Sequence, residues 1–135
     1  DGFLGGSGMA NFYLYRPVAT NVHRLLAWDR DTTFQEVESP IFARVSENAL
    51  MSRALRFADL RKLFLDVLEQ CARSAAQDRW LEAEIQQSHL LIRDAAYDDV
   101  SKPSSNEEYE HAIAHLMSFA QRCPAFVLDE ISRSR

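Results

Sequence analysis

Glycine is confined to the first residues of this 135-residue chain, and this confinement divides the chain into two unlike parts. All four glycines lie between Gly2 and Gly8, directly ahead of the short apolar run NFYLYR that begins at Asn11. Glycine permits backbone conformations with positive φ, so it favours turns and close approaches over regular elements. From Ser39 onward, apolar residues recur every three or four positions, which is the spacing of amphipathic helices. The sequence therefore predicts a glycine loop and extended segments, followed by helices.

Two strand-like runs, 11–16 and 22–27, surround the turn-like segment Pro17–Asn21. Such runs around a short turn are typical of a β-hairpin. Tyr13 and Tyr15 would share one face of the first strand, and apolar residues would occupy the other face as well. An isolated hairpin is marginally stable in water, so two apolar faces need cover on both sides. Dimerisation, or a contact with another chain through the exposed hairpin, is therefore expected.

The helical part is predicted to begin with a short helix. Ser39 followed by Pro40 is a favourable start, and this helix would end near Glu47. A longer amphipathic helix is then expected over Leu50–Cys71, where apolar residues recur at helical spacing.

Three further helices are expected in the second half of the chain. Asp78 would cap a helix whose apolar stripe covers 81–96. Ser105 with Glu108 three residues later predicts a capping box at the start of the next helix. Pro124 is expected to interrupt that helix, with a last short helix after it. The expected fold class is mainly α with a short N-terminal β-hairpin.

Charge and composition argue against several classes of function. The formal net charge is −5 and no basic block occurs, so the chain lacks the features of a general nucleic-acid binder. No apolar run reaches the ~18 residues of a membrane span. His111 and His115 could hold zinc from one helix face, but no glutamate follows His111, and surface or half-buried histidines are favoured.

The only two cysteines, Cys71 and Cys123, both lie among apolar residues at helical spacing. That setting predicts free, buried thiols. A single disulfide between them stays open as an alternative.

Two carboxylates lie close together in the segment WDRDTTF. Asp29 and Asp31 alternate around Arg30, directly after Trp28. Neighbouring carboxylates repel each other, and a divalent cation relieves this repulsion. Their hard oxygens suit Mg²⁺, Mn²⁺ or Ca²⁺. The alternative is a polar turn without a metal, because aspartate is common in turns.

The order of polar residues along the first part of the chain resembles that of a protein-kinase C-lobe. The chain reads Asp1, a variable loop, Asn11, two short strands around a turn, and then Asp29. In kinases, the first of these positions accepts the proton of the substrate hydroxyl, and the other two hold metal ions at the nucleotide phosphates. A hairpin sets the separation of such oxygens, which neutralise charge during phosphoryl transfer.

The residues themselves resemble the spore-coat-protein-H (CotH) kinase family. The resemblance is carried by NFYLY, by Trp28–Phe34 with its WDxD pattern, and by the run from Ser39 to Gln70. It implies an atypical protein-kinase fold that uses ATP and a divalent metal to phosphorylate protein serines. It also suggests a secreted, cell-surface or spore-coat location in bacteria.

The resemblance implies roles for four residues. Asp1 matches the catalytic aspartate, Asn11 a metal ligand that serves the nucleotide, and Asp29 the metal aspartate of WDxD, while Asp31 would have a supporting role. ATP with Mg²⁺, or with Mn²⁺ or Ca²⁺, is the implied cofactor set, and a protein is the implied substrate. The sequence departs from the family pattern in its long loop after Asp1, in Arg30, and in Gln35, where glycine is common.

A kinase also needs an N-lobe with a nucleotide-contacting lysine, and this chain has only Lys62 and Lys102, both in the helical part. We therefore expect a C-terminal kinase fragment. Residues 1–35 would carry the catalytic and metal loops with the hairpin, and 36–135 would form the helical C-lobe of a single domain that lacks its N-lobe. Such a fragment is expected to be inactive alone. The alternative is a non-catalytic, pseudokinase-like helical module for binding or scaffolding in spore-coat or envelope assembly.

Overall fold

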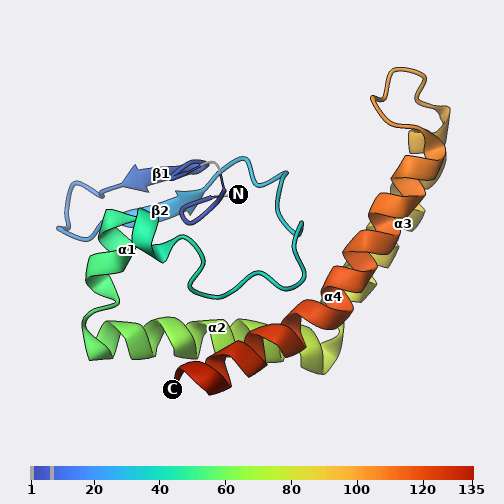
Figure 1. Cartoon of the computed structure of the whole chain (residues 1–135). Coiled ribbons are helices and arrows are strands. Elements are labelled where there is room, and N and C mark those ends of the chain that lie inside the picture. The colour runs from blue at the N-terminus through green and yellow to red at the C-terminus, as the bar shows by residue number, and fades with distance from the viewer. Residues whose placement is uncertain (1, 7) are drawn as a thin grey trace. The chain divides into compact units, whose positions relative to one another are not determined.

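The structure of the chain is a computed structural model that describes residues 2–6 and 8–135 (Figure 1). The chain divides into two compact units. The first comprises Asp1–Gln35 with Phe42–Leu63, and the second comprises Glu36–Ile41 with Phe64–Arg135. Most of the structure is helical, with one antiparallel pair of strands. The expected class, mainly α with a short N-terminal β-hairpin, is confirmed.

The hairpin lies in the first unit and forms as expected. Strand β1 (Phe12–Tyr15) pairs antiparallel with β2 (Arg24–Ala27), and Phe12 lies opposite Ala27 while Tyr15 lies opposite Arg24. Most of its apolar side chains are exposed, on both faces: Tyr13, Leu14, Tyr15, Leu25 and Leu26. Dimerisation through this surface stays a prediction.

The first helix does not start where Ser39 and Pro40 predict. The structure has a turn-rich segment there, then a 3₁₀ turn over Val45–Glu47 and α1 over Ala49–Ala54. Asn48 caps α1 instead, because its side-chain oxygen accepts hydrogen bonds from the backbone N–H groups of Leu50 and Met51, at 3.1 and 3.0 Å. The expectation of a helix from Pro40 was wrong because a better N-cap lies farther along the chain.

The long second helix is also displaced from its expected bounds. Instead of one helix over Leu50–Cys71, α1 ends at Ala54 and α2 runs over Ala58–Asp78. Asp78 is the last residue of α2 and does not cap the next helix. Arg79, in the left-handed region at φ 48°, turns the chain into α3 (Trp80–Asp98).

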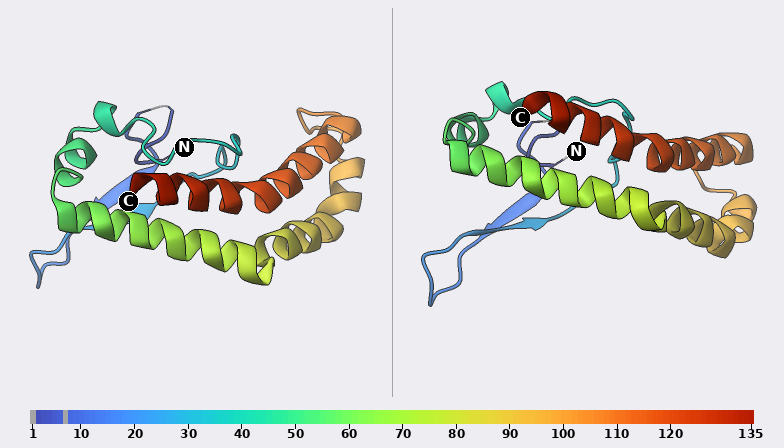
Figure 2. Two further views of the ribbon diagram at one scale, coloured as in Figure 1. Left: turned by 60° about the horizontal axis from the view of Figure 1, so that its bottom comes forward. Right: turned by 90° about the horizontal axis from the view of Figure 1, so that it is seen from below.

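The last helix, α4, runs over Asn106–Ser134 without a break. Its capping box of Ser105 and Glu108 is present as predicted. Pro124 does not end the helix, although the two views in Figure 2 show α4 bending along its length. Proline removes one helical hydrogen bond, but Ala120 and Ile131 on either side of it are buried, and their packing holds the helix together across that gap.

A polar cluster joins α3 to α4, which pack side by side (Figure 1). Glu110 accepts hydrogen bonds from Arg93 Nε at 2.9 Å and from the Tyr97 hydroxyl at 2.6 Å. These two bonds hold the pKa of Glu110 below its ordinary value. His89 Nδ1 lies 3.1 Å from the Tyr109 hydroxyl, so this half-buried histidine lies at the edge of the packing between α3 and α4.

Glu110→Gln is expected to reduce the loss of folding stability as the pH falls below neutral. A carboxylate with a lowered folded-state pKa contributes stability above its unfolded pKa and loses it as the pH falls through the folded value. The native protein should therefore lose more stability between about pH 5 and pH 3 than the variant does. Thermal unfolding at stepped pH tests this, with the exposed Glu84→Gln as control. Parallel profiles for the native protein and Glu110→Gln would contradict the prediction.

Both cysteines are free, but Cys71 is exposed rather than buried, so that part of the expectation was wrong. Cys123 is half-buried, and burial raises the pKa of its thiol. His111 and His115 are exposed, in agreement with the interpretation as surface histidines.

Candidate functional site

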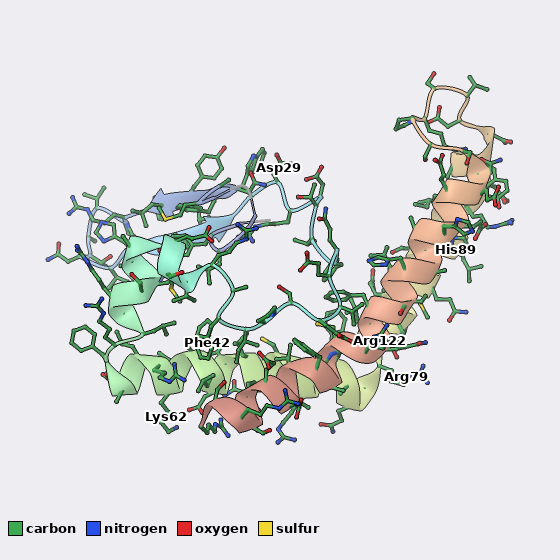
Figure 3. The ribbon with its side chains drawn as sticks, viewed as in Figure 1. Asp29, Phe42, Lys62, Arg79, His89 and Arg122 are labelled. Carbon is green, nitrogen blue, oxygen red and sulfur yellow. The ribbon has the colours of Figure 1, made fainter. Side chains whose placement is uncertain are left out.

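The base of the hairpin brings two of the predicted site residues to the same end of the strands. Beyond the pair Phe12–Ala27, the backbone N–H of Trp28 donates to the Asn11 carbonyl at 3.0 Å. Asn11 therefore accepts this last backbone bond, and Asp29, which Figure 3 labels, directly follows its donor Trp28. Both residues lie in the left-handed region, at φ 56° and 49°, which asparagine and aspartate tolerate better than most residues.

The loop after Asp29 is exposed and is closed by its own hydrogen bond. The Thr33 hydroxyl donates to the Arg30 carbonyl at 2.8 Å, which fixes a turn around Asp31. Asp29 and Asp31 are both exposed. At the end of the loop Phe34 has φ 62°, a conformation that is strained for a bulky side chain.

The glycine loop forms two consecutive turns. The Gly5 N–H donates to the Gly2 carbonyl at 2.9 Å, and the Gly8 N–H donates to the Gly5 carbonyl at 3.2 Å. Gly2 has φ 102°, and a Cβ there would lie 1.8 Å from Nη1 of Arg30. The Arg30 guanidinium thus lies directly against the glycine loop. This end of a flexible side chain could move aside, so the positive φ is the reason that glycine suits position 2. Asp1, the predicted catalytic residue, lies outside the described residues.

Aromatic contacts connect the loops to the hairpin. The rings of Phe3 and Phe12 meet edge-on with centroids 5.2 Å apart. The rings of Tyr13 and Trp28 do the same at 5.7 Å. Such pairs add stability beyond the area that they bury. They tie the residue after Gly2, and the residue before Asp29, to the first strand.

Asn48 is a positioning residue that the sequence pattern did not predict. Its side chain caps α1, and its Nδ2 also donates to the Phe3 carbonyl at 2.9 Å. The residue is only 3% exposed. Its capping role could have been predicted from the sequence, because asparagine is among the best N-caps. Its hydrogen bond to the Phe3 carbonyl joins positions 45 apart, and no local sequence pattern predicts it.

The amide and carboxylate oxygens at the hairpin base are of the ligand type that a hard divalent cation prefers. Within residues 2–6 and 8–135, no group of three or more His, Cys, Asp or Glu side chains forms a metal cluster. Nucleotide-bound Mg²⁺ does not need one, because it takes one or two protein oxygens and completes its shell with phosphates and water. The side chains of Asn11 and Asp29 offer one amide oxygen and one carboxylate for that purpose.

The fold and this site define a mainly helical domain whose N-terminal hairpin carries oxygen-bearing side chains at its base. The chain matches the family described as CotH kinase protein over residues 1–127, and it therefore belongs to this family. The resemblance recognised in NFYLY and WDRDTTF is confirmed. Neither the curated proteins nor the solved structures gave a match. In the part of the chain that the structure describes, no helix has the length and apolarity needed to cross a bilayer.

Proposed function

We propose that this chain supplies the metal-binding and hydroxyl-orienting part of a protein kinase that transfers the γ-phosphate of ATP to a protein serine. One observation carries the proposal. The bond between the Trp28 N–H and the Asn11 carbonyl sets Asn11 and Asp29 at one end of a hairpin, in the order that kinases use for their metal ligands. Membership of the CotH kinase family supports the same function.

In this proposal two polar residues bind the metal, a third supports their loop and a fourth orients the substrate hydroxyl. The side-chain oxygens of Asn11 and Asp29 hold the cation, and Asp31 supports the loop that carries Asp29. Asp1 orients the substrate hydroxyl and accepts its proton. A cation bound at the hairpin base would neutralise negative charge on the phosphates of ATP. The helical second part would correspond to a kinase-like C-lobe.

The lysines of the chain support a role as part of a larger kinase. Lys62 lies in α2, and Lys102 donates hydrogen bonds to the Ala96 carbonyl and the Asn106 side chain at the loop before α4. Neither lysine is on a strand. The nucleotide-contacting lysine would therefore come from residues outside this sequence, and the chain alone is expected not to transfer phosphate at a useful rate.

Metal-dependent nucleotide binding tests the proposal. The natural polypeptide that contains this sequence should be stabilised by ATP only when Mg²⁺ or Mn²⁺ is present. At about 100 times its dissociation constant, the nucleotide would stabilise the fold by about 2.7 kcal/mol, which raises the unfolding temperature by several degrees. Thermal shift with and without a chelator measures this, and a parallel series with Ca²⁺ separates the possible metals. An unfolding temperature that ATP and metal leave unchanged would favour the scaffold alternative.

A further inference from the structure

The second unit contains a cavity that the proposed kinase chemistry does not use. It has a volume of about 350 Å³ and lies where α2 turns into α3, against the middle of α4. Figure 3 labels Arg79 at this turn. Ala75 and Ala76 line the cavity from α2, Glu82 lines it from α3, and Ala120, Pro124 and Leu128 line it from α4. Most of this lining is alkyl, so the few polar atoms decide what the cavity can bind.

Glu82 presents an acceptor without a donor. Its side chain is only 10% exposed, and Oε1 accepts a hydrogen bond from Arg79 Nε at 2.9 Å. The other oxygen, Oε2, is buried and has no hydrogen-bond partner within the described structure. The bond from Arg79 is the main reason that the pKa of Glu82 lies below its ordinary value, so the group is ionised at neutral pH. A buried carboxylate oxygen without a donor is rare in folded proteins.

Pro124 removes the usual helical donor of a backbone carbonyl in a residue that lines the same cavity. Proline has no N–H, so the Ala120 carbonyl, four residues earlier in α4, loses its usual helical donor. Ala120 is 3% exposed, and both residues line the cavity. The cavity therefore has an ionised acceptor at Glu82 and a backbone carbonyl at Ala120 in a lining that is otherwise mostly alkyl, with Arg79 and Gln121 as its other polar side chains.

We propose that this cavity binds an alkylammonium group, either a free primary amine or the side chain of a lysine on another polypeptide. An ammonium carries three donors and no acceptor, so it can supply the donor that Glu82 Oε2 lacks. Its N–H groups would reach Glu82 Oε2 and the Ala120 carbonyl, and its carbon chain would lie against Ala75, Ala76 and Leu128. Charge-assisted bonds are stronger than neutral ones, so the ionised carboxylate favours an ammonium over an alcohol.

Titration of the full chain with n-butylammonium, followed by amide NMR, tests the proposal. The resonances of Glu82 and Ala120 should shift saturably. The neutral n-butanol should bind at least about tenfold more weakly, and tetramethylammonium, which has charge but no N–H, should produce no saturable shift. A short peptide with one lysine, compared with its acetyllysine form, shows whether a polypeptide side chain can supply the same group.

Three variants separate this site from a cavity that is filled by water. Glu82→Gln keeps the shape of the side chain but removes its charge, and should weaken binding by about tenfold. Pro124→Ala restores a donor to the Ala120 carbonyl and should weaken binding by a few-fold. Glu84→Gln, an exposed residue of α3, should have no effect. Equal binding of butanol and butylammonium to the native chain would overturn the proposal, even if Glu82→Gln fails to fold. So would the absence of saturable binding, which would mean that water satisfies Glu82.

Discussion

Replacing Asp29 with asparagine is expected to lower phosphate transfer by the natural polypeptide at least about 100-fold while leaving its unfolding temperature unchanged. Asp29 is exposed at the base of the hairpin, so the substitution removes little packing. It does remove a carboxylate charge that the proposed cation needs close to the phosphates. The measurement is the rate of transfer from labelled ATP to a serine-containing protein, paired with a thermal unfolding curve of each variant.

Two matched variants sharpen this result. Asp31→Asn lies in the same exposed loop and should have a smaller effect, because its proposed role is supporting. Asp94→Asn, on an exposed part of α3, should leave the rate unchanged. Loss of activity with a lowered unfolding temperature would point to a structural role for Asp29. An Asp29→Asn protein as active as the native one would remove the metal proposal.

Asn48→Ala is expected to lower the free energy of unfolding by about 2 kcal/mol. The substitution removes the cap of α1 and leaves the Phe3 carbonyl without its donor. Urea unfolding measures the loss, and hydrogen exchange at Gly5 should quicken because the glycine loop is released. Both effects follow from one buried side chain that serves two segments.

Asn48→Asp distinguishes the two contributions. Aspartate keeps the acceptor that caps α1 but cannot donate to the Phe3 carbonyl, so about half of the loss should remain. Asn21→Ala, an exposed residue of the hairpin loop, should change stability by less than about 0.5 kcal/mol. If Asn48→Ala falls within that same range, Asn48 does not anchor the loop.

Local patterns predicted the elements whose causes are local. The hairpin follows from apolar runs around a short turn, and the capping box follows from Ser105 and Glu108. Once the hairpin is recognised, the approach of Asn11 to Asp29 is also predictable, because both residues lie just outside paired strands. The candidate site at the hairpin base is therefore largely visible in the sequence.

The features that escaped prediction depend on contacts between distant residues. Ser39 and Pro40 have the residue types of a helix start, but the helix begins after Asn48 instead. Asn48 makes two capping hydrogen bonds and a third bond to a residue 45 positions away. Local preferences predict that Pro124 breaks the helix, but α4 continues past it, with buried residues on both sides of the proline. The buried oxygen of Glu82 likewise exists only because three helices meet around it.

The pairing of Phe12 with Ala27 has a consequence for how this chain can change in evolution. The loop between Tyr15 and Arg24 joins the far ends of the strands, so it can gain or lose residues without moving Asn11 from Asp29. A single deletion inside β1 would instead turn the later side chains to the opposite face and shift Asn11 along its partner strand. Insertions and deletions should therefore occur in related sequences at the hairpin tip but not within the strands, because the strands set the geometry of the site.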